Sequence, residues 1–153
     1  MDGIFLYAHF LLRLLWGLTM QAPVSKSSAE GWPALKRYYL AASLQLPERG
    51  QLVLPCQYRG KPASMVVVRL NGLIYGFLNR CVHMPFRLDC EHASVIDPSA
   101  NRIKCSMHGL VFDPLTGACQ SPTMCTGEKL MAIGLCEESQ IIWLEDKDVT
   151  LQN

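Results

Sequence analysis

The sequence predicts a small all-β domain, and three observations support this fold class. No stretch after residue 50 repeats its apolar residues at the spacing of a long helix. Over the same region, short runs rich in Val, Leu and Ile alternate with turn-forming residues. The chain has 153 residues, 50% of them hydrophobic, which is enough for one domain with one core.

An apolar segment, "GIFLYAHFLLRLLWGLTM" at 3–20, precedes this domain. On a helix, Asp2, His9 and Arg13 would share one narrow face. The segment is slightly short for a membrane span, its central Arg opposes insertion, and a signal peptide would begin with positive charge. Three alternatives remain open: a helix that lies on a membrane or a partner subunit, a start placed too early with Met20 as the true first residue, or a membrane anchor.

Residues 21–31 are small and polar, as in a linker, and the globular domain is expected over 32–150. Asn71-Gly72 between two strand-like runs predicts a hairpin, and the run from Asp113 to Gly117 predicts the turn of a second hairpin. The remaining strands are expected at 37–43 (which also fits a short helix), 51–58, 63–70, 101–105, 129–136 and 140–145, with a turn at 46–51.

The net charge and the number of cysteines limit which functions and cellular locations are expected. A net charge of +1, with no block of Lys or Arg, argues against nucleic acid as the main partner. Seven cysteines are an odd number, which does not suit a closed disulfide framework. We therefore expect a reducing, cytoplasmic location, either free or peripheral to the cytoplasmic face of the membrane, with the cysteines as thiols or metal ligands.

Two Cys/His pairs are the main indication of function in the sequence. Cys81 and His83 are two residues apart, Cys105 and His108 are three apart, and each pair follows a strand-like run. Two thiolates and two imidazoles can hold zinc, or a two-iron cluster with both Cys on one iron and both His on the other. Zinc fingers keep like ligands together in one loop, whereas here each loop supplies one of each. The spacing therefore favours the two-iron cluster.

This pattern resembles the signature of Rieske [2Fe-2S] ferredoxin-like proteins. "VVVRLNGLIYGFLNRCVH" at 66–83 resembles the two strands and first cluster loop of that family, and "IKCSMHGLVFDPLTGACQSP" at 103–122 resembles the second cluster loop and the segment after it. The resemblance covers about residues 36 to 145. It implies a small antiparallel β-sandwich or barrel, with a cluster-binding subdomain of two hairpin loops. The implied [2Fe-2S] ligands are Cys81, His83, Cys105 and His108.

A second Cys-x-His occurs at Cys90 and His92. We favour Cys81 and His83 as the ligands because they directly follow the "LN" strand end, as in the family. "FRLD" at 86–89 also fits stand-alone Rieske proteins that have a longer insert between the two loops. Cys90 and His92 would then lie in that insert, as a surface pair.

The other cysteines have structural interpretations. Cys56 and Cys136 lie in strand-like runs and are read as small apolar core residues. Cys119 and Cys125 flank "QSPTM", where the resemblance implies a loop that covers the cluster, with Pro122 shielding it from water. A disulfide between Cys119 and Cys125 is the alternative.

Departures from the family pattern predict a low reduction potential. High-potential members carry an extra cysteine in each loop, where this chain has Phe86 and Met107. They also carry a Ser and a Tyr that donate hydrogen bonds to sulfur, where this chain has Leu110 and Phe112. Losing those donors disfavours the reduced state, so we expect a potential of about −150 to 0 mV. Surface histidine ligands would make this potential depend on pH in the alkaline range.

The resemblance implies an electron-transfer protein, or a component of an oxidoreductase system, rather than a complete enzyme. Outside the cluster loops only His9 and His92 remain, which are too few for the mononuclear iron domain of a Rieske oxygenase. The expected partners are a reductase and an oxygenase or other acceptor, contacted through an apolar rim of Met84, Pro85, Phe86 and Met107. The alternatives are a subunit of a membrane-associated redox complex held by residues 1–20, and a zinc-binding structural module.

Overall fold

The structure is a computed structural model that describes residues 36–90, 93–122 and 124–151. These described residues form one compact unit. The expected N-terminal helix or anchor (1–20) and the linker (21–31) lie outside the described residues. Within the described part of the chain, no helix is long and apolar enough to cross a membrane.

The described residues form ten strands and one 3-10 turn, which confirms the all-β fold class. The elements are β1 (Tyr38–Ala42), η1 (Ser43–Gln45), β2 (Gln51–Tyr58), β3 (Lys61–Leu70), β4 (Leu73–Leu78), β5 (Ile103–Lys104), β6 (Val111–Phe112), β7 (Ala132–Ile133), β8 (Leu135–Glu138), β9 (Ile141–Leu144) and β10 (Val149–Leu151).

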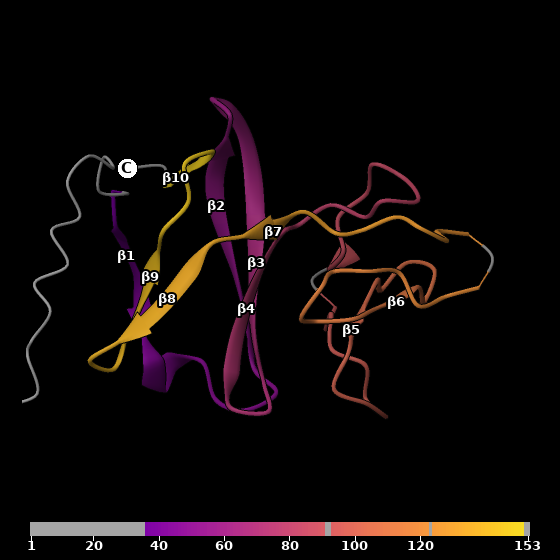
Figure 1. Ribbon diagram of the computed structural model, residues 1–153, viewed down its shortest axis with the longest axis horizontal. Helices are drawn as coiled ribbons and strands as arrows, with labels where there is room; N and C mark the ends of the chain where they lie inside the picture. The colour runs from indigo at the N-terminus through magenta and orange to yellow at the C-terminus, as the bar shows by residue number, and fades with distance from the viewer. Residues whose placement is uncertain (1–35, 91–92, 123, 152–153) are drawn as a thin grey trace, which may run out of the picture. The chain divides into compact units, whose positions relative to one another are not determined.

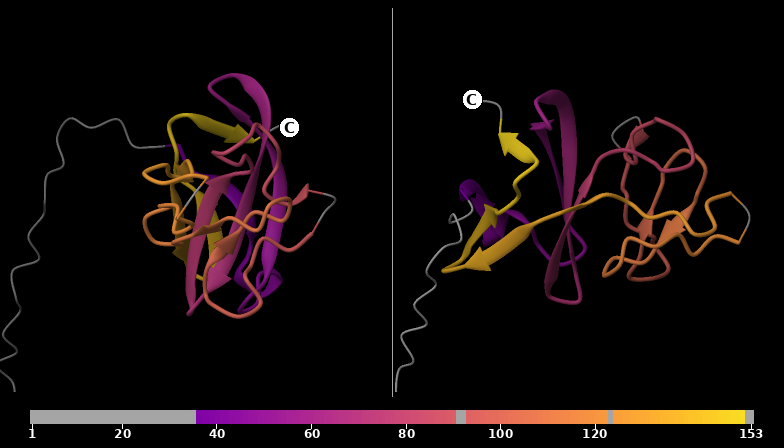
Figure 2. Two further views of the ribbon diagram at one scale, coloured as in Figure 1. Left: turned by 90° about the vertical axis from the view of Figure 1, so that its right-hand side faces the viewer. Right: turned by 45° about the horizontal axis from the view of Figure 1, so that its top comes forward.

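The strands form three antiparallel sheets. The orders are β1-β9-β8, β10-β2-β3-β4-β7 and β5-β6. Figure 1 shows the five-stranded sheet in the middle, with β1, β8 and β9 on one side and β5 and β6 on the other. The left view of Figure 2 faces the segment that holds β5 and β6. We call this segment, residues 79–130, the loop subdomain.

Both faces of the central sheet are buried, which explains the continuous apolar run in β3. Val66, Val68 and Leu70 pack into one core, which also holds Ile103 of β5. The alternate residues of β3 point to the opposite face, because successive side chains of a strand alternate. There Met65 and Val67 join a second core, together with residues of β9 such as Ile142 and Leu144. The loop subdomain is therefore anchored to one face of β3 and β4.

Three two-residue hairpin turns hold the strands in register. Asn71 and Gly72 have positive φ angles of 53° and 74°, so the predicted hairpin turn between β3 and β4 is confirmed. Arg59 and Gly60 form the same kind of turn between β2 and β3, with φ angles of 49° and 75°. Between β8 and β9, two non-glycine residues take this conformation, Ser139 at 53° and Gln140 at 64°.

Most of the expected strands agree with the structure. The range 51–58 is β2, and the ambiguous segment 37–43 is a strand that passes into the 3-10 turn. The second predicted hairpin turns at 113–117, where Asp113 N–H bonds to Ala118 O at 2.9 Å. The strand β10 was not predicted. It has only three residues and pairs with β2 over Val149 and Leu151, so it depends on a distant partner.

The turn between β8 and β9 offers a test of backbone strain. Gln140→Gly should raise the free energy of unfolding by about 0.5–1 kcal/mol, because glycine adopts positive φ without a Cβ clash. Gly72→Ala should lower it by about 1 kcal/mol, since a Cβ at Gly72 meets no atom within 4 Å and only the backbone cost remains. Chemical denaturation of both variants measures these changes, and equal effects of the same sign would contradict the assignment.

Candidate metal centre

Two loops of similar construction carry the predicted ligand pairs. The first loop (80–86) follows β4, and the second loop (105–110) joins β5 to β6. In the first, Cys81 N–H bonds to Phe86 O at 2.8 Å, and in the second, Cys105 N–H bonds to Leu110 O at 2.8 Å. Gly109 closes the second loop with a φ of 71°, a conformation that suits glycine. Each loop therefore closes five residues after its cysteine.

The structure brings the four predicted ligand residues together. The Cys81 and Cys105 side chains are buried in the same core. The rings of His83 and His108 lie side by side, with centroids 5.1 Å apart and planes at 87°. His108 is exposed and His83 is half-buried. The site thus has a buried pair of sulfurs and an outer pair of imidazoles.

The polar atoms of the site fit a cofactor that binds through both sulfur and nitrogen. His83 Nδ1 is buried and has no hydrogen-bond partner, which is costly unless a ligand takes the nitrogen lone pair. Burial raises the pKa of the Cys81 thiol, and the neighbouring Cys105 raises it further, while backbone N–H groups of His83 and Met84 oppose this rise. A bound cation would favour the thiolate form that ligation needs.

The four residues form two pairs of like ligands, Cys81 with Cys105 and His83 with His108. In a two-iron cluster each iron takes two protein ligands, and the remaining positions are filled by sulfide. The two like pairs of the site match this requirement.

A buried carboxylate fixes the first loop to the insert that follows it. Asp89 is only 1% exposed, and it accepts hydrogen bonds from Asn79 Nδ2 at 2.7 Å and from Arg87 Nε and Nη2 at 2.8 Å each. Asn79 Oδ1 accepts the N–H of Leu88 at 2.9 Å. Burial alone would raise the pKa of Asp89, but the hydrogen bonds from Arg87 and Asn79 outweigh it and hold that pKa below its usual value.

The insert in turn fixes the second loop. Leu88 O accepts both the backbone N–H and the hydroxyl of Ser106, each at 2.8 Å. The Ser106 hydroxyl also reaches Cys90 O at 3.4 Å. Since Ser106 directly follows Cys105, these contacts set the distance between the two loops. The sequence pattern did not reveal this network, because its members are ordinary polar residues whose partners come from other segments.

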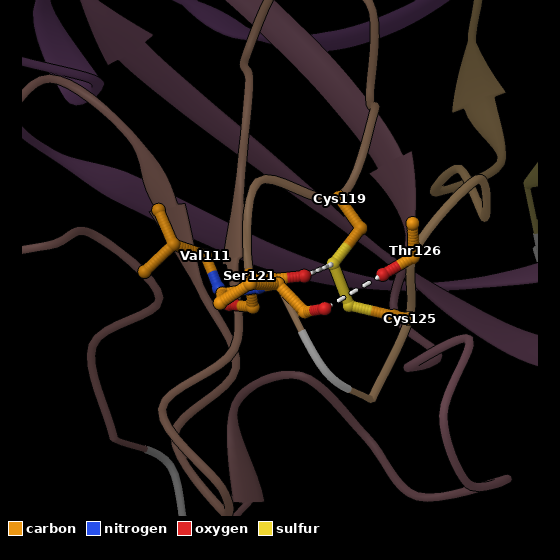
Figure 3. The surroundings of a disulfide bond; sticks show 6 residues. Val111, Cys119, Ser121, Cys125 and Thr126 are labelled. Atoms are coloured by element: carbon orange, nitrogen blue, oxygen red, sulfur yellow. Dashed lines mark hydrogen bonds between the residues drawn. A yellow bond between two sulfur atoms is a disulfide. The ribbon is translucent and has the colours of Figure 1, made fainter.

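A third loop beside the site is closed by a disulfide between Cys119 and Cys125, which Figure 3 shows. This finding corrects the reading of these two cysteines as thiols and confirms the alternative. Cys125 is buried in the core that holds Cys81 and Cys105, whereas Pro122 is exposed. Ser121 Oγ accepts Val111 N–H at 3.0 Å and ties this loop to β6.

The other residues singled out in the sequence differ in how exposed their side chains are. Phe86 and Met107 are 48% and 44% exposed, whereas Leu110 and Phe112 are buried and bring no hydroxyl to the site. Cys90 is half-buried and unpaired, while its neighbour His92 lies outside the described residues. The cysteines read as core residues, at 56 and 136, lie in β2 and β8; the first is fully buried and the second half-buried.

Removing the buried carboxylate should loosen both loops. Asp89→Asn leaves Arg87 without its counter-charge, and we expect it to lower the free energy of unfolding by about 1–3 kcal/mol at neutral pH. Because the pKa of Asp89 is lowered in the folded protein, its stabilisation is present above about pH 4 and is lost as the pH falls below that value.

Denaturation of both proteins at several pH values, with the metal content of each sample, measures the effect. The matched control is Glu138→Gln, which alters an exposed carboxylate of β8 that is ion-paired with Arg37, away from both loops. If Asp89→Asn shows the same acid sensitivity as the wild type, the carboxylate does not fix the loops.

Several solved structures share this architecture. Comparison with curated proteins finds no sequence match. Among solved structures, the chain is similar to the ferredoxin of carbazole 1,9a-dioxygenase from Nocardioides aromaticivorans IC177, with 23% identity and a TM-score of 0.54. The match covers 72% of this chain and 98% of that one. At this identity, the likeness concerns the fold.

Longer proteins share the same fold over part of their length. The reduced complex between oxygenase and ferredoxin in carbazole 1,9a-dioxygenase matches at 17% identity and a TM-score of 0.58, over 72% of this chain and 28% of that one. The terminal oxygenase of carbazole 1,9a-dioxygenase from Novosphingobium sp. KA1 matches at the same identity and TM-score, over 78% and 32%. This chain therefore spans about a third of those proteins or less.

The family comparison agrees with the loop geometry. The model of the family described as "Rieske [2Fe-2S] domain" matches residues 36–132, more than half of the chain, and this range includes all three loops. The cofactor of that domain is a [2Fe-2S] cluster, which suits the paired sulfurs and imidazoles. The chain belongs to the Rieske [2Fe-2S] domain family.

Proposed function

We propose that this protein is a one-electron carrier that passes electrons from a reductase to an oxygenase. Its cluster would be held by Cys81 and Cys105 on one iron and by His83 and His108 on the other. The observation that carries this proposal is the layered site, with buried sulfurs, outer imidazoles and the unpartnered Nδ1 of His83. The cluster supplies a one-electron redox couple.

The side chains around the site would support this chemistry in different ways. The apolar core keeps water away from Cys81 and Cys105, and two backbone N–H groups stabilise negative charge on the Cys81 sulfur. His108, exposed at the tip of the second loop, would form the exit for the electron.

The proposed oxygenase partner is supported by the ferredoxin of a dioxygenase system among the similar structures. Met84, Phe86 and Met107 lie within three residues of the two histidines in the sequence and are 42–48% exposed, so they offer an apolar rim for a small, short-lived interface. Residues 1–20 favour a second candidate, a subunit held at a membrane or in a larger redox complex. Cell fractionation of the chain with and without residues 1–20 separates the two candidates.

The ligand assignment predicts a specific spectroscopic result. Dithionite-reduced protein should give a rhombic Rieske-type EPR signal with about two irons per chain. Cys81→Ser and Cys105→Ser should abolish the signal, whereas His108→Cys should change its shape if the cluster assembles. Cys90→Ser is the matched control and should leave the signal intact. One zinc per chain without a signal would refute the electron-transfer role, and signal loss in Cys90→Ser would refute the ligand set.

The buried side chains of Leu110 and Phe112, which carry no hydroxyl, predict a low reduction potential. Protein-film voltammetry should give a midpoint of about −150 to 0 mV. Phe112→Tyr and Leu110→Ser each introduce a hydroxyl near the sulfurs and should raise the midpoint by tens of millivolts, since about 1.4 kcal/mol of differential stabilisation corresponds to about 59 mV for one electron. A wild-type midpoint above about +150 mV would contradict the proposed tuning.

A further inference from the structure

A groove leads along the surface of the domain to the first loop. Its larger part, of 760 Å³, is lined by the β2–β3 hairpin and the end of β4. Its smaller part, of 380 Å³, is lined by the first loop and includes Cys81 and His83. Tyr58, Leu78, Arg80 and Pro85 line both parts, so the two hollows adjoin.

The groove is strongly cationic, although the whole chain has a net charge of only +1. It is lined by Lys61, Arg80, Arg87 and Lys129, with Glu128 as its single acidic residue. Arg87 is paired with Asp89. Within the described ranges, no carboxylate forms an ion pair with the other three cations. These charges are available to a partner.

Between the cations, the groove offers apolar and adaptable side chains. Met84 and Met131 are 42% and 48% exposed, and both line the smaller part. Tyr58 donates its hydroxyl to the Met131 sulfur at 3.0 Å and forms part of the floor. Methionine side chains adjust to different partner surfaces. An extended protein surface fits this lining better than a small anion, because the cations are exposed and spread along the groove rather than converging on one point.

We propose that this groove docks an acidic surface of the redox partner, with carboxylates against Lys61, Arg80 and Lys129 and an apolar side chain against Met84. This inference rests on the proposed function and adds the kind of partner that it requires. A partner seated there contacts the loop that holds His83, whose ring centroid lies 5.1 Å from that of His108, the proposed electron exit. Complementary charge would act mainly on the association rate.

The test uses two electron acceptors of opposite charge with the cluster-loaded, reduced protein. One electron passes from the reduced cluster to the ferric haem of acidic cytochrome b5 or of basic cytochrome c, which leaves ferrous haem and oxidised cluster. Stopped-flow rate constants are measured from low to high salt. With cytochrome b5 the rate should be high at low salt and fall as salt is added, and with cytochrome c the salt dependence should be reversed.

Charge-reversal variants test which residues of this protein attract cytochrome b5. Lys61→Glu and Arg80→Glu should each slow the reduction of cytochrome b5 about tenfold at low salt. Lys61 lies at the start of β3, twenty residues before Cys81 in the sequence, so its variant leaves the first loop unaltered. The matched control is Arg102→Glu, an exposed residue near the opposite end of β3, where its neighbour Asn101 bonds to Asn71.

Oxidation by neutral benzoquinone should stay unchanged in the Lys61 and Arg102 variants, because it needs no charged docking surface. Equal rates for the Lys61, Arg80 and Arg102 variants with cytochrome b5 would overturn the docking inference while leaving the carrier function intact. A reduced cluster that transfers no electron to either cytochrome would overturn the proposed function itself.

Discussion

The contact between Asn79 and the buried carboxylate of Asp89 is the interaction on which the loop subdomain depends. Asn79 directly follows β4, the strand that leads into the first loop, and its side chain also accepts the backbone N–H of Leu88. Leu88 then holds Ser106, next to the second cysteine. A displacement at Asn79 would pass through these hydrogen bonds and alter the spacing of both loops. The polar network thus performs the positioning that short, irregular loops cannot achieve through packing alone.

The two faces of the central sheet pack against different parts of the domain. One face of β3 packs against β9 and supports the domain, and the other face packs against the loops. Because Val66 and Val67 belong to different cores, a change at one position should affect one half of the domain more than the other. The sulfurs of Cys81 and Cys105 lie in the loop-side core, so that core also sets how dry the site is.

Local patterns predicted much of the fold and of the candidate site. The Asn71-Gly72 turn and the Cys-x-His and Cys-x2-His spacings depend on neighbouring residues, so the sequence shows them directly. The strand β10 and the Asp89 network depend on partners far along the chain, and neither leaves a local signal. The sequence left the Cys119–Cys125 disulfide undecided. An odd number of cysteines is compatible with one disulfide beside free thiols, and equally with no disulfide.

This disulfide has a consequence for the selectivity of cluster assembly. Four cysteine sulfurs lie in or against one core, those of Cys81, Cys105, Cys119 and Cys125. As free thiols, all four would compete for incoming iron, since a thiolate is a strong ligand wherever it lies. A sulfur in a disulfide carries no negative charge and has little affinity for iron. The bridge therefore leaves two thiols in this core as sulfur donors for iron, one from each cluster loop.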